Sequence, residues 1–145
     1  MIALVIIVIA AIVYIISKEK KEKKEQERQV DAFMGQYEKM RQLSIEQNTG
    51  REDDFIDDSM FGLEVSKPYF VAGDAQGVLL HLNTLKTIDG ESLTFTRRGS
   101  FLVDDGNVVD KYEGKTSDGS TYGAIYVNEY CSRTSSKPPA GYRFD

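Results

Sequence analysis

The chain has 145 residues, a length that ordinarily forms one small domain around a single core. Its formal net charge is -5, and 41% of its residues are hydrophobic. The charge is uneven: residues 18–52 carry nine Lys and Arg against eight Asp and Glu, whereas residues 53–145 carry nine against fifteen. The acidic distal part argues against nucleic acid as a partner, because phosphates require a basic surface.

The single cysteine and the single histidine limit the catalytic and metal-binding sites that this chain can form. Cys131 has no second cysteine with which to form a disulfide or a metal-binding pair, and His81 is the only histidine. A Cys131–His81 dyad, with Asp110 or Asp118 as the orienting carboxylate, is supported by no local motif. No glycine-rich phosphate-binding motif is present either. The sequence therefore favours a non-catalytic protein without cofactor or metal, and an enzyme that uses Cys131 or a carboxylate site is a third alternative.

The first seventeen residues carry no charged side chain. In lipid, backbone groups must bond within their own segment, so we expect residues 1–17 to form a transmembrane helix about 25 Å long in contact with the bilayer. The predicted anchor residues are Ile2, Leu4, Ile7, Ile9, Ile12, Tyr14 and Ile16. A cleavable signal peptide is the alternative, but no basic residue precedes the apolar run, and residues 14–18 do not form a small-residue cleavage site.

Basic residues lie on only one side of the apolar run. They are Lys18, Lys20, Lys21, Lys23, Lys24 and Arg28. By the positive-inside rule these residues set the topology, with the N-terminus outside and the distal domain in the cytoplasm. One unpaired cysteine is consistent with that compartment. The alternative is an extracytoplasmic domain.

Residues 18–50 predict a helical stalk. Residues 18–29 contain only strong helix formers, and an apolar stripe follows at steps of three and four residues. The stripe residues, expected to make a helix contact, are Val30, Phe33, Tyr37 and Met40. The stripe either packs on the distal domain or contacts another helix, which allows a homo-oligomer. Asn48-Thr49-Gly50 provides the stop, because Gly50 can adopt a left-handed C-cap conformation.

The segment at residues 51–60 holds four carboxylates between positions 53 and 58. It lacks the alternating ligands and the glycine of a calcium loop, so we expect an exposed acidic linker. From residue 61 onward, Asp-Gly pairs stand between β-prone segments, which is a strong signal for hairpins. We expect strands near 80–87, 92–103, 107–115 and 121–131, with an earlier one at 61–72 that is broken by Pro68.

Residues 74–87 fit two structures. Leu79, Leu82 and Leu85 step by three as on a helix that Asp74 can cap, whereas Val78, Leu80 and Leu82 alternate as on a strand. We favour the helix, because leucine is a better helix former than strand former. The predicted fold class is α+β: an N-terminal transmembrane helix continues into a long charged helix, followed at 61–145 by a small antiparallel β-meander domain with one short helix and a C-terminal Ser/Pro loop.

The last predicted strand separates two kinds of side chain. Its aliphatic face carries Ile125, Val127 and Cys131, and the tyrosines on its other face are Tyr122, Tyr126 and Tyr130. If the aliphatic face packs inward, the tyrosines form a row that can bind a protein partner. The alternative is that they pack beneath the helix or the C-terminal tail.

These features favour a single-pass membrane-anchored, non-catalytic accessory, scaffold or regulatory subunit that binds protein partners. The layout also resembles that of type IV pilin-like subunits, in which an apolar N-terminal helix leads into a four-stranded antiparallel domain. That resemblance implies a structural subunit with an extracytoplasmic β domain. Such pilins carry a glutamate at the fifth mature position and a longer uncharged run, whereas this chain has Val5 and becomes charged at Lys18.

Overall fold

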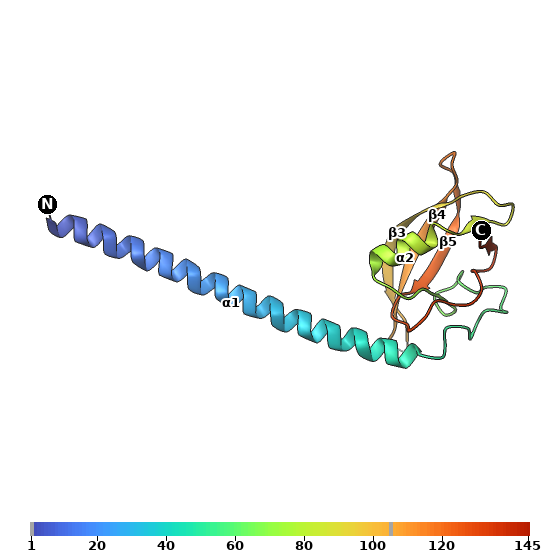
Figure 1. Cartoon of the computed structure of the whole chain (residues 1–145), viewed down its shortest axis with the longest axis horizontal. Helices are drawn as coiled ribbons and strands as arrows, with labels where there is room; N and C mark the ends of the chain where they lie inside the picture. The colour runs from blue at the N-terminus through green and yellow to red at the C-terminus, as the bar shows by residue number, and fades with distance from the viewer. Residues whose placement is uncertain (1, 105) are drawn as a thin grey trace. The chain divides into compact units, whose positions relative to one another are not determined.

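The computed structural model describes the backbone of residues 2–104 and 106–145 and the side chains of residues 14–104 and 106–145. Its elements are α1 (Ile2–Asn48), β1 (Tyr69–Phe70), α2 (Ala75–Leu82), β2 (Lys86–Thr87), β3 (Thr94–Leu102), β4 (Val108–Lys115), β5 (Thr121–Asn128) and β6 (Tyr142–Arg143) (Figure 1). The chain forms two compact units, Met1–Met40 and Arg41–Asp145. The α+β class, the long N-terminal helix and the small, largely antiparallel sheet domain are confirmed.

Helix α1 is a continuous helix of 47 residues. Its charged part carries exposed pairs such as Lys18–Glu22, whose nitrogen and oxygen lie 3.9 Å apart and which adds a few tenths of a kcal/mol at most. The helix ends at Asn48, where the amide of Thr49 donates to the carbonyl of Ile45 and Gly50 has a φ of +89°. The predicted glycine stop is therefore confirmed.

The predicted membrane anchor falls mostly outside the described side chains. The predicted anchor residues from Ile2 to Ile12 lie outside the described side chains. Tyr14 and Ile16 are described, and both are exposed. Among the residues that the structure describes, none of the helices combines the length and the apolar character that crossing a membrane requires.

The main sheet has the strand order β1-β5-β4-β3. Strands β3, β4 and β5 form the predicted antiparallel meander, and Gly106 and Gly119 supply the positive φ of its two hairpin turns. The expectation of a purely antiparallel sheet is wrong, because β1 pairs with β5 in parallel, with Tyr69 opposite Val127. The strand expected at 61–72 is reduced to two residues, since Pro68, just before it, has no amide hydrogen to donate to a ladder.

The helix favoured within residues 74–87 is confirmed in a shorter form. Helix α2 is capped by Asp74, whose Oδ1 accepts from the amide of Gly77 at 2.8 Å. The strand expected at 80–87 is limited to β2, which pairs with β6 near the C-terminus in a separate two-stranded sheet. The Asp89-Gly90 turn therefore does not join two strands of the main sheet, and the last long strand stops at Asn128 rather than at residue 131.

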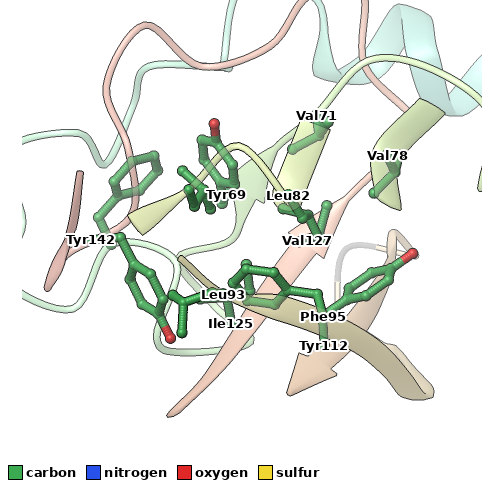
Figure 2. Close-up of a cluster of buried hydrophobic side chains, with 12 residues drawn as sticks. Tyr69, Val71, Val78, Leu82, Leu93, Phe95, Tyr112, Ile125, Val127 and Tyr142 are labelled. Atoms are coloured by element: carbon green, nitrogen blue, oxygen red, sulfur yellow. The ribbon is translucent and has the colours of Figure 1, made fainter. Parts of the chain in front are cut away.

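The core lies where α2 packs against one face of the main sheet (Figure 2). Val78 and Leu82 of α2 are fully buried, as are Ile125 and Val127 of β5. Each such side chain stabilises the fold by about 1.5–3 kcal/mol relative to an exposed one. The remaining members come from the neighbouring strands and loops, namely Phe61, Tyr69, Val71, Leu85, Leu93, Phe95, Tyr112 and Tyr142.

The acidic segment at 51–60 is not the exposed linker that its composition predicts. Two of its carboxylates bind the C-terminal Ser/Pro loop: the guanidinium of Arg133 lies 2.7 Å from Asp53, and the ammonium of Lys137 lies 2.6 Å from Asp57. Phe55 and Ile56 pack against the core. The opposite charges lie about eighty positions later in the chain, so no local pattern reveals this contact. The hydrogen bond from Arg133 lowers the pKa of Asp53 to about 2.

Two glycines in the sheet provide a matched test of this packing. A Cβ added at Gly114 would lie 2.9 Å from Cε1 of the buried Phe95 ring, whereas at Gly99 it would meet nothing within 4 Å. We expect Gly114→Ala to destabilise the domain by about 1–3 kcal/mol through overpacking. Gly99→Ala should change stability by less than about 0.5 kcal/mol. Urea unfolding of both variants measures the difference, and equal midpoints would contradict the described packing of Phe95.

Candidate interaction surfaces and buried polar groups

The predicted stripe on α1 is exposed. We define the apolar stripe as Val30, Phe33, Met34, Tyr37 and Met40, whose exposed fractions lie between 39% and 64%. Met34 lies beside the four residues that the spacing indicated, on the same helix face. No charged residue belongs to the stripe, although α1 carries many charges elsewhere. A contiguous apolar surface of this kind is typical of a contact site for another apolar surface.

Within β5, Ile125 and Val127 are buried as the alternation predicted, and Cys131, which lies beyond the end of the strand, is buried as well. Tyr122 holds the C-terminal segment. Its hydroxyl donates to the carbonyl of Gly141 at 2.8 Å and accepts from the amide of Ile88 at 3.2 Å. Tyr122 is therefore engaged within the domain, as the alternative of packing beneath the tail anticipates.

The other two tyrosines have different neighbours. The ring of Tyr126 contacts Phe101 edge to face, with centroids 5.8 Å apart, and the ammonium of Lys111 lies 5.9 Å from its centroid. Both Tyr126 and Tyr130 are half-buried, and the carbonyl of Tyr130 accepts from the side chain of Asn48. The three tyrosines thus belong to three separate local clusters. Their role as partner-binding residues stays a prediction.

Asn48, which the sequence indicated only as part of the helix stop, joins the end of α1 to the sheet domain. Its side-chain amide donates to the Oδ1 of Asn107 at 2.9 Å and to the carbonyl of Tyr130 at 2.8 Å. Asn48, Asn107 and Asn128 are buried beside a cavity of about 30 Å³, room for one water molecule but not for a cofactor. This cluster therefore has a structural role: it connects the end of α1 to the sheet domain by hydrogen bonds.

A second buried polar group lies near the middle of β4. Asp110 is almost fully buried and accepts two hydrogen bonds of 2.9 Å from the guanidinium of Arg97. Nearby Glu129 has a buried Oε2 without a hydrogen-bond partner among the described residues. Burial and then the negative charge of Asp110 raise the pKa of Glu129, while Arg97 and Arg41 act in the opposite direction. Glu129 therefore holds a proton more tightly than an ordinary glutamate.

The structure gives Cys131 and His81 different partners. The His81 Nε2 atom lies 2.7 Å from the hydroxyl of Tyr69, and burial lowers the pKa of His81. The Cys131 thiol donates to the carbonyl of Asn128, and burial raises the pKa of Cys131 to about 12. A thiol with that pKa is a poor nucleophile at neutral pH. Among the residues that the structure describes, no cluster of His, Cys, Asp and Glu could hold a metal ion.

Comparisons with known proteins give no match from which a function could be inferred, so the functional conclusions rest on this chain's own residues. We find no matching family model, no similar curated protein and no similar solved structure.

The raised pKa of Glu129, whose buried Oε2 atom has no hydrogen-bond partner among the described residues, predicts a pH-dependent contribution to stability. Because its folded-state pKa lies above the ordinary 4.5, the stability that Glu129 contributes is full below that value and falls as the pH rises through the folded pKa. We expect Glu129→Gln to raise the free energy of unfolding at pH 7, because the neutral amide removes a partly buried negative charge near Asp110. The gain should disappear near pH 4, as measured by urea unfolding at both pH values.

Glu113 on β4 is the control. Its hydrogen bond with Arg98 lowers its pKa, so its stabilising contribution is present above the unfolded pKa and is lost as the pH falls. Glu113→Gln should therefore weaken the fold at pH 7 and have no effect at low pH. A gain in stability from Glu129→Gln that is equal at both pH values would contradict the buried, protonatable state of Glu129.

Proposed function

We propose that this chain is a single-pass membrane-anchored, non-catalytic accessory, scaffold or regulatory subunit that acts by binding protein through the apolar stripe of α1. The observation that carries the proposal is the exposure of five neighbouring apolar side chains on one face of α1, after the charged residues 18–29. Exposed apolar patches on polar surroundings are typical of interaction sites. Residues 18–29 then act as a charged spacer between the bilayer and the stripe.

The anchor is supported by the sequence. Residues 1–17 carry no charge and are followed directly by Lys18, Lys20 and Lys21. A run of seventeen residues is at the short end of the range for spanning helices, and the long lysine side chains can reach outward to the headgroups. The same basic residues favour a cytoplasmic domain by the positive-inside rule.

The alternative is a pilin-like structural subunit with the domain on the outer side. The supporting observation is the single long helix that leads into a small sheet domain. The parallel β1–β5 pairing departs from the all-antiparallel domain of that family. The two proposals differ in the side of the membrane on which the domain lies, so a topology measurement distinguishes them.

Membrane attachment is tested by charges placed within the predicted anchor. We expect the full chain to remain in the membrane pellet after alkaline carbonate extraction, and the Ile7→Asp, Ile9→Asp double variant to move to the supernatant. Each carboxylate at the centre of a spanning helix costs about 2.5–3.5 kcal/mol. The Ile7→Leu, Ile9→Leu variant is the matched control. Recovery of the unmodified chain in the supernatant would overturn the anchor.

The side of the membrane is tested with an introduced thiol. Cys131 is unsuitable, because it is buried and its pKa is raised to about 12, whereas Leu80 on α2 is 64% exposed. We expect Leu80→Cys to react with an impermeant maleimide only after the cells are lysed. The unmodified chain gives the background from Cys131. Labelling of Leu80→Cys in intact cells would reject the cytoplasmic domain in favour of the pilin-like alternative.

A further inference from the structure

We propose that the partner of the apolar stripe is the same stripe on a second copy of this chain, with the two α1 helices parallel and in register. The inference rests on the proposed membrane anchoring, which places the amino ends of both copies at the same bilayer. The side chains of the stripe are exposed in the single chain, and in the proposed pair the second copy covers them.

The spacing of the stripe fits a parallel helix pair. Val30 and Tyr37 are seven residues apart and occupy the first core position of a heptad repeat, while Phe33 and Met40 occupy its second core position. In a parallel pair each of these residues packs against its own copy. The core of the contact then consists only of apolar side chains, and two aromatic pairs lie at its centre.

The charges beside the stripe favour self-pairing over a partner of opposite charge. The positions that flank the core between residues 29 and 41 are Gln29, Met34, Gln36 and Arg41, of which only Arg41, at the end of the contact, is charged. In a parallel pair Arg41 faces Gln36 of the other copy, so two copies meet there without like-charge repulsion, and an acidic partner helix would find a cation only at Arg41. Upstream, Lys23 falls on a core position and would face Lys23 of the other copy. The repulsion limits the contact to about two heptads, residues 29–41.

The size of the contact explains why it depends on the bilayer. The stripe contributes five side chains from each copy, whereas a stable complex in solution uses roughly 20–30 residues from each partner. Anchoring both copies in one membrane raises their effective concentration toward the millimolar range, where so small a contact is occupied. The stripe therefore acts as a weak dimer contact that the anchor makes effective.

Site-specific cross-linking tests this pairing in the full chain, purified and reconstituted into lipid vesicles. Val30→Cys places a thiol at a core position, where the Cα atoms of the two copies come within the range that a disulfide can bridge. Ala32→Cys places the same thiol on the opposite face of the helix and is the matched control. The buried Cys131 does not compete. We expect air oxidation with a copper catalyst to form disulfide-linked dimer at least tenfold faster with Val30→Cys.

A second variant distinguishes dimers that form through the stripe from disulfides that form when two chains collide at random. Phe33→Gln and Tyr37→Gln, added to Val30→Cys, remove the aromatic pairs while keeping helix-forming residues, and should reduce cross-linking about tenfold. Equal cross-linking at positions 30 and 32, or no effect of the glutamines, overturns the self-pairing. In cells, cross-linking of Val30→Cys to a protein of another mass in place of a dimer overturns it as well.

Sedimentation with the vesicles is measured on the same samples. A chain that sediments but does not form the selective dimer overturns self-pairing and leaves the membrane anchor intact. A chain that does not sediment overturns the anchor itself, and with it the self-pairing that depends on the anchor. The two failures are therefore distinguishable.

Discussion

The position of β5 within the sheet is the constraint on which the domain depends. Its inward side chains Ile125 and Val127 are fully buried, and it pairs with β4 along one edge and with β1 along the other. Beyond β1, the amide of Tyr126 donates to the carbonyl of Gly62 at 2.8 Å. Just past the strand, the carbonyl of Tyr130 receives the side chain of Asn48. One strand thus contacts the core, the segment that precedes β1 and, through the residues just past its end, the end of α1.

Local patterns predicted those elements that depend on neighbouring residues. Alternation along β5 identified Ile125 and Val127 as buried, and a polar residue before a leucine-rich run identified Asp74 as the cap of α2. Gly50 marked the end of α1 for the same reason, since a left-handed residue is needed at that place. The spacing that places the apolar stripe on one helix face is equally local, so the candidate surface could be read from the sequence.

Contacts between distant segments could not be read in this way. The parallel pairing of β1 with β5 joins Tyr69 to Val127, and the ion pair between Asp53 and Arg133 spans eighty residues. A run of carboxylates is typical of an exposed linker unless cations from elsewhere neutralise it, and nothing in residues 51–60 indicates those cations. The buried Oε2 atom of Glu129 was missed for a related reason, because its neighbour Asp110 comes from β4, which is distant in the sequence.

The composition of α1 argues that the apolar stripe was not selected for the stability of an isolated helix. Residues 18–29 are all strong helix formers, whereas the next stretch includes Val30, Phe33 and Tyr37, which are weaker, and Gly35, which costs about 1 kcal/mol relative to alanine. Gly35 permits no close approach within the chain, since a Cβ there would meet nothing within 4 Å. The stretch is therefore less stable as a lone helix than the stalk before it, and burial of the stripe in the proposed helix pair would offset that difference.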